Sequence, residues 1–161
     1  MEQELIELIK TNQERYYRVA FTYVKNKEDA LDVVHNAIVK ALQKIDQLQK
    51  KEYLGTWFYR ILINEGISFI RKRRNIIELD GLPESQIPVT KDIDKEQHMT
   101  LYAAIDQLPL KYKTVIILRF FEDLKLEEIA KITETNLSTV KSRLYKALEL
   151  LRMDIEEIEY D

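Results

Sequence analysis

The stretch from residue 126 to residue 148 most constrains the fold, because its apolar residues follow the period of two successive helices. Leu126, Ile129 and Ala130 lie on one face of a first segment. A polar turn then interrupts the period, and Asn136 is placed to cap a second helix there. The second segment keeps one apolar face for three turns, formed by Val140, Leu144, Ala147, Leu148 and Leu151. The stretch therefore predicts a helix-turn-helix.

A helical wheel centred on Val140 turns a polar face of the second helix away from the core. That face carries Ser138, Ser142, Tyr145 and Lys146, with Lys141 and Thr139 on its flanks. Short hydroxyls and a Lys near the start of a helix can approach base edges in a groove, while Arg143, nearer the buried side, can reach a phosphate. Helix pairs joined by a polar turn also occur in all-α proteins that bind no DNA, so both interpretations remain open here.

Composition favours an all-α chain. Three Gly and three Pro among 161 residues permit long helices and argue against a turn-rich β architecture. The absence of Cys excludes disulfides, thiolate zinc sites and a Cys nucleophile. Residues 1–10 are acidic and amphipathic, unlike a signal peptide, and the longest strongly apolar run, 115–118, is too short to cross a bilayer. We expect a cytoplasmic protein without membrane insertion.

Apolar periodicity predicts further helices upstream of the helix-turn-helix. The expected ranges are 5–24, 28–48, 56–74, 98–108 and 109–121. In the first helix we expect Leu5, Ile9, Tyr17, Phe21 and Val24 in the core. The last of these helices begins at Pro109, a position where proline is tolerated.

A segment without apolar period, residues 75–97, separates the two groups of helices. It contains Gly81, Pro83 and Pro88, and a connection this long is unusual within a compact domain. We expect two small helical domains, 1–74 and 98–153, joined by this flexible acidic linker. The second would be a four-helix domain containing the helix-turn-helix, followed by an acidic tail, 154–161.

Charge is distributed unevenly along the chain, whose net charge is −3. Residues 1–74 hold 14 Lys and Arg against 10 Asp and Glu, a net +4, whereas residues 75–97 hold 2 against 6, a net −4. Residues 98–152 hold 9 against 7, a net +2, and the tail holds none against 5. An acidic average therefore does not exclude a basic, nucleic-acid-binding face.

The strongest local charge signal is the run Arg71, Lys72, Arg73 and Arg74 at the expected end of the third helix. One or two cations there would suit the negative end of the helix dipole. Four in a row exceed that need, so contact with phosphates is an equally good interpretation.

Taken together, these motifs resemble the ECF (extracytoplasmic function, group 4) type of bacterial RNA polymerase sigma factor. The resemblance covers nearly everything from residue 16 to residue 152 apart from the linker, and it depends on the order and spacing of several short motifs. These are EDALDVVH at 28–35, TWFYRILIN at 56–64, Leu108-Pro109, Leu118-Arg119, EEIA at 127–130 and TVKSRL at 139–144.

The resemblance implies a promoter-specificity subunit that binds core RNA polymerase and promoter DNA and has no cofactor. Its second helix would dock on the β′ clamp helices of polymerase through Asp29, Asp32, His35 and Asn36. Its second domain would contact the β flap. The resemblance implies one further partner, an anti-sigma factor, which in this family is often membrane-anchored.

The resemblance also implies two DNA contacts. Minus-ten DNA would be captured and melted by Lys50, Lys51, Tyr53, Asn64, Arg71, Lys72, Arg73 and Arg74. Minus-thirty-five DNA would be read or held by Arg119, Ser138, Thr139, Lys141, Ser142, Arg143 and Lys146. Trp57 fits either the core or a wedge that helps melting.

The sequence departs from the family at several positions. His35 replaces a more usual Gln, and Ile38 an aromatic residue. Gly66 replaces a common Ala. Asp123 and Glu134 stand where relatives usually have Gly, and a positive φ at Glu134 would strain the turn.

No nucleophile with a base, metal cluster or phosphate-cradling Gly loop is apparent, and His35 has no second metal ligand nearby in the sequence, so we expect neither an enzyme nor a metal site. Two alternatives to the sigma factor are a stand-alone helix-turn-helix regulator, which would need to dimerise, and a helical adaptor that binds only protein.

Overall fold

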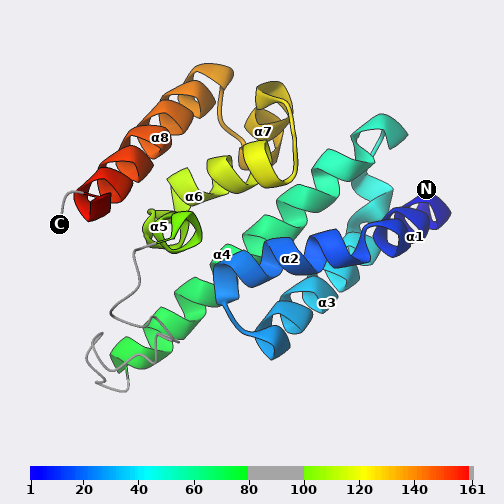
Figure 1. Cartoon of the computed structure of the whole chain (residues 1–161). Coiled ribbons are helices and arrows are strands. Elements are labelled where there is room, and N and C mark those ends of the chain that lie inside the picture. Colours follow the sequence, from blue (N-terminus) through cyan, green and yellow to red (C-terminus); the bar gives the residue numbers. More distant parts are fainter. Residues whose placement is uncertain (80–99, 160–161) are drawn as a thin grey trace. The chain divides into compact units, whose positions relative to one another are not determined.

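The structure, a computed structural model, describes residues 1–79 and 100–159, with side chains described for 1–75 and 100–153. All regular elements in these ranges are helices (Figure 1). The chain divides into two compact units, 1–90 and 91–161. Most of the expected linker and the side chains of the expected acidic tail lie outside the described residues.

Four α-helices form the first unit. They are α1 (Glu2–Thr11), α2 (Gln13–Val24), α3 (Lys27–Lys44) and α4 (Leu54–Leu79). Two short 3-10 turns, η1 (Ile45–Gln47) and η2 (Lys51–Tyr53), connect α3 to α4. Tyr16 packs at the centre of this unit, with its ring centroid 4.7 Å from that of Phe58 and 5.4 Å from that of Tyr59.

The single helix predicted over 5–24 is two helices, because the chain breaks at Asn12. The Asn12 side chain donates a hydrogen bond to the Leu8 carbonyl at 2.9 Å and so ends α1. The predicted burial of Tyr17 and Phe21 is also wrong: Tyr17 is half-buried and Phe21 is 38% exposed. Both lie about 100° around the helix from the buried positions Tyr16 and Ala20.

Helix α4 is longer than predicted, because it continues five residues beyond Arg74 to Leu79. No Gly or Pro occurs between Gly66 and Gly81, so the sequence contains no early stop signal. Gly66 within this helix allows a close approach, since a Cβ atom there would lie 3.3 Å from Cδ2 of the buried Tyr23.

The second unit contains α5 (Leu101–Gln107), α6 (Leu110–Ile116), α7 (Leu126–Thr133) and α8 (Leu137–Glu159). Pro109 is the N-cap of α6, as its position predicts. Helix α6 passes into a π-helical turn, η4 (Ile117–Phe121), which the Glu122 N–H closes on the Ile117 carbonyl at 3.0 Å. The fully buried residues Val115, Leu118, Ile129, Val140 and Ala147 form the core.

Lys113 is 4% exposed and lies 3.7 Å from the Asp106 carboxylate, measured from Nζ to Oδ1. This ion pair links α6 to α5. A buried ammonium is costly without such a partner, so the more exposed Asp106 carboxylate offsets the burial of Lys113.

Candidate nucleic-acid and polymerase interfaces

The turn between α7 and α8 consists of Glu134, Thr135 and Asn136. Glu134 adopts the left-handed conformation, with φ 55° and ψ 39°. The Thr135 N–H donates to the Ala130 carbonyl at 3.0 Å, which closes the end of α7. Asn136 caps α8, since its Oδ1 accepts a 2.7 Å hydrogen bond from the Thr139 N–H. The predicted helix-turn-helix and its Asn136 cap are therefore confirmed.

The orientation predicted for α8 is also confirmed. Val140, Leu144, Ala147 and Leu151 are buried, and Val140 is fully so. The predicted burial of Leu148 on the same face is wrong: it is 40% exposed, because it lies about 100° around the helix from the buried Ala147. Ser138, Lys141, Ser142 and Lys146 are exposed on the opposite side, while Thr139 and Arg143 are half-buried between the two faces. The hydroxyls and the first ammonium lie within the first two turns of the helix, where they can enter a groove.

Two of the cations predicted to bind minus-thirty-five DNA already have partners on their own unit. Arg119 donates from Nη1 to the Leu124 carbonyl at 3.2 Å and lies 4.0 Å from the Asp123 carboxylate. This contact braces the loop in which Asp123 has a φ of 53°. Lys146 lies 3.8 Å from Glu149 on α8. Both side chains remain at least two-fifths exposed, so their other donors can face solvent.

The four cations of the run 71–74 are exposed, and they lie inside α4 rather than at its end. The favourable interaction of a cation with the helix dipole fades within the last turn. In α4 the last turn begins after Asn75, so this interaction does not account for the run. A solvent-facing cationic surface one to two turns before the helix end fits the backbone of a nucleic acid.

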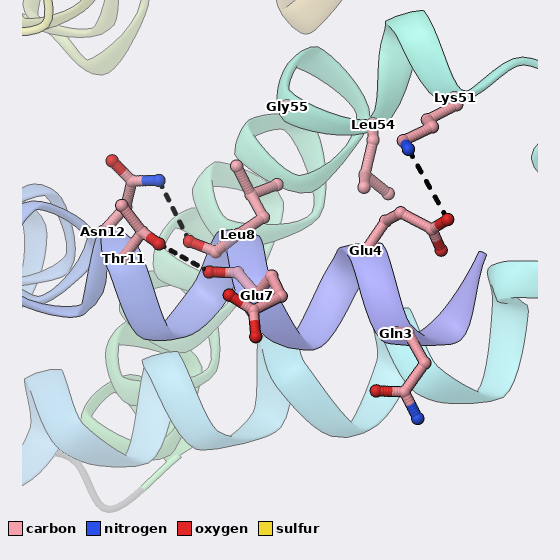
Figure 2. A pocket seen from close by; sticks show the side chains of 9 residues that line it. All are labelled: Gln3, Glu4, Glu7, Leu8, Thr11, Asn12, Lys51, Leu54 and Gly55. Carbon is pink, nitrogen blue, oxygen red and sulfur yellow. Dashed lines mark hydrogen bonds and ion pairs between the residues drawn. The ribbon is translucent and has the colours of Figure 1, made fainter.

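The loop before α4 carries Lys50, Lys51 and Tyr53, all exposed, with Tyr53 at 41%. Lys51 Nζ lies 3.5 Å from Glu4 Oε1, which ties the loop to α1 (Figure 2). A backbone hydrogen bond at Glu4, reinforced by the Met1 ammonium and by Lys51, lowers the pKa of this carboxyl. A hollow beside this contact is lined by Gln3, Glu4, Glu7, Leu8, Thr11, Asn12, Lys51, Leu54 and Gly55.

Asn64 is exposed on α4, ten residues beyond the start of the helix. Trp57 is half-buried on the same helix, between the buried Leu54 and Phe58. Its burial assigns it neither wholly to the core nor wholly to the surface.

The predicted polymerase-contacting residues lie along α3. Asp32, His35 and Asn36 are exposed, and Asp29 is half-buried in the first turn. Asp29 forms an ion pair that the sequence did not predict, with its Oδ2 3.3 Å from Nη1 of Arg73 on α4. A second ion pair, between Lys40 and Glu65, joins the same two helices farther along. Partners 44 residues apart leave no periodic signal in a sequence, so the first pair could not be anticipated.

An exposed apolar cluster on α5 and η4 was also missed. Tyr102 and Phe121 stack with centroids 6.1 Å apart, and they are 67% and 46% exposed. Leu101 and Phe120 are 50% and 56% exposed. Because the period of the apolar residues places them on predicted helices, nothing in the sequence distinguished them from core residues.

Within the described ranges, no group of three or more His, Asp or Glu side chains is arranged to hold a metal ion. The described helices also include none that combines the length and apolar character needed to span a membrane.

Comparison with protein families matches residues 8–76 to sigma-70 region 2 and residues 98–151 to sigma-70, region 4. The chain is 46% identical over 151 residues to the RNA polymerase sigma factor SigV of Bacillus subtilis, covering 94% of this chain and 90% of that protein. It is 26% identical over 166 residues to the ECF RNA polymerase sigma factor SigW of the same organism, covering 94% and 89%.

Among solved structures, the fold is similar to that of the sigma factor RpoE from Bartonella quintana, determined in complex with the anti-sigma factor NepR. The TM-score is 0.73 at 24% identity, covering 93% of this chain and 95% of that one. It is also similar to CnrH in complex with the cytosolic domain of CnrY, with a TM-score of 0.72 at 18% identity, covering 98% and 90%.

Proposed function

Since this chain belongs to the ECF sigma factors, we propose that its two helical units divide promoter recognition between them. As a sigma factor it is a promoter-specificity subunit: it binds core RNA polymerase and directs initiation at a dedicated set of promoters. We infer that it acts in the cytoplasm, in response to stress, and carries no catalytic site of its own.

The outward face of α8 is the proposed binding surface for minus-thirty-five DNA. We assign base contacts to Ser138, Thr139, Lys141 and Ser142, because they occupy the first turns of a capped helix whose other face is buried. Phosphate contacts are assigned to three other cations: Arg143 lies beside the buried face of α8, Lys146 lies farther along that helix, and Arg119 lies on η4.

Minus-ten DNA is assigned to the surface formed by the loop and α4. The cationic run 71–74 would follow the backbone, with Lys50 and Lys51 at the other end. Tyr53 would stack on a flipped base and Asn64 would read a base edge. The helical rise puts Asn64 about 15 Å along α4 from Leu54, so we assign these two side chains to different nucleotides.

Polymerase contacts are assigned to α3 and to the exposed apolar cluster. Asp29, Asp32, His35 and Asn36 would face the β′ clamp helices. The cluster around Tyr102 and Phe121 suits a protein partner better than a phosphate backbone, because exposed apolar patches commonly mark protein interfaces. We place the β flap there.

We also propose an anti-sigma factor, either membrane-anchored or free, as a partner that holds the sigma factor inactive. The complex of RpoE with NepR supports this proposal, because that protein has the same fold. Purification from cells under several growth conditions should recover a second small protein besides polymerase; recovery of polymerase alone would argue against it.

The direct test of the proposed function combines gel filtration with run-off transcription. The protein should elute together with core polymerase, and the mixture should start transcripts at defined positions on genomic promoter fragments. A stand-alone helix-turn-helix regulator would bind DNA without core polymerase, and a protein-binding adaptor would restore no specific transcript. Core polymerase alone is the control.

A further inference from the structure

We propose that Asp29 holds Arg73 in the free sigma factor and releases it to DNA when polymerase docks on α3. The inference rests on the proposed function, which gives the exposed face of α3 to polymerase and the cationic run of α4 to minus-ten DNA. The ion pair joins one residue of each surface, so a single contact connects the two binding events.

The position of Asp29, the acidic partner in this ion pair, is fixed by the cap of α3. Asp29 lies in the first turn of α3, where its backbone N–H donates to the Asn26 side chain at 3.1 Å. That cap sets the position of the carboxylate at one end of α3. Helices α3 and α4 lie side by side in the first unit (Figure 1), so Arg73 reaches across from α4 to the Asp29 carboxylate at 3.3 Å.

The pair is exposed enough to exchange partners. The Arg73 side chain is 46% exposed and that of Asp29 is 23% exposed. Ion pairs in such settings are weak, because solvent screens them and two side chains must be held in one geometry. A cation from polymerase can therefore take over the carboxylate, and the guanidinium is then available for a phosphate.

The same surfaces offer matched controls. Asp32 lies on the same exposed face of α3 and forms no ion pair with any side chain the structure describes. Arg71, Lys72 and Arg74 belong to the same run as Arg73 and likewise have no ion pair with a described side chain. In the free protein, three of the four cations in the run are then exposed without an acidic partner among the described side chains.

The experiment measures the affinity of the free, full-length protein for nonspecific duplex DNA across a salt series. One additional phosphate contact steepens the slope of log affinity against log salt by about 0.9. Asp29→Asn should produce that change and tighten binding at low salt by up to about fivefold. Asp32→Asn removes the same charge and should leave the slope unchanged, and Asp29→Asn with Arg73→Gln should return it to the wild-type value.

Two controls separate the proposal from loss of structure. Asp29→Asn leaves the backbone hydrogen bond to Asn26 in place, so the helical circular dichroism should equal that of the wild type. Asp29→Glu keeps the charge and should keep the wild-type slope. If Asp29→Asn and Asp32→Asn have the same slope, Asp29 does not hold Arg73 back and the proposal is wrong.

The holoenzyme distinguishes this failure from failure of the proposed function. Arg73→Gln should leave the slope of the free protein unchanged and lower that of the promoter-bound holoenzyme by about 0.9. If the holoenzyme slope does not move, Arg73 does not contact DNA, and both the switch and the assignment of Arg73 are wrong. If the holoenzyme slope falls while free Asp29→Asn and Asp32→Asn have the same slope, Arg73 contacts DNA and only the proposed switch is wrong.

Discussion

At the scale of single residues, Glu134 shows how this chain departs from the usual turn. Its φ of 55° lies in the left-handed region, where an L-residue with a Cβ is strained by about 1 kcal/mol or more. The strain expected from the sequence at this position is therefore present. Hydrogen bonds fix the turn at both ends despite this strain: the Thr135 N–H donates to the end of α7, and the Asn136 side chain caps α8.

Replacing Glu134 with Gly should therefore stabilise the protein. We expect the free energy of unfolding in urea to rise by about 0.5 to 1 kcal/mol, because relief of the left-handed strain exceeds the added entropy of the unfolded chain. Glu127→Gly, in the regular helix α7, is the control and should lower it by a similar amount. A loss of stability in Glu134→Gly would mean that the glutamate side chain contributes more than the strain costs.

At the scale of elements, α8 presents two classes of polar side chain. Lys141 is exposed in the first turns, whereas Arg143 is half-buried beside the core face. Lys141→Ala should cost roughly 1 to 3 kcal/mol at the preferred minus-thirty-five sequence and less at a mutated one. Arg143→Gln should weaken both sequences alike and lower the salt slope by about one. Both effects can be measured as the affinity of the holoenzyme for the preferred and the mutated minus-thirty-five sequence across a salt series.

Elements with a long apolar period could be predicted from the sequence. The helix-turn-helix, its Asn136 cap and the buried face around Val140 follow from the spacing of apolar residues and from one capping side chain. The break at Asn12 was missed although Asn favours helix caps and turns, because the apolar residues on both sides of it fit one continuous helical period. The end of α4 was placed too early, since four cations resemble a helix terminus although Gly81 is the first stop signal.

For the candidate site residues, exposure could be predicted from the sequence but contacts between distant segments could not. Exposure of Ser138, Lys141 and Asn64 follows from helical geometry. The contacts of Arg73 with Asp29 and of Lys51 with Glu4 arise from the packing of distant segments, which single-sequence periodicity does not encode. The exposed rings of Tyr102 and Phe121 were missed for a related reason, because apolar character alone does not distinguish a core from a docking surface.

At the scale of the whole molecule, we assign one promoter element to each unit. Both units are all-α and each matches its own sigma-70 region. The first unit presents Asn64 and the cationic run of α4, and the second presents the first turns of α8. If recognition is divided in this way, a change in either unit should alter selectivity at one promoter element and not at the other.

The most direct measurement compares Asn64→Ala and Lys141→Ala holoenzymes on four promoters, in which each element is either matched or mutated. Lys141→Ala should narrow the difference between matched and mutated minus-thirty-five elements and leave minus-ten discrimination unchanged. Asn64→Ala should do the reverse. If either variant reduces discrimination at both elements equally, the proposed division of promoter recognition between the two units is wrong.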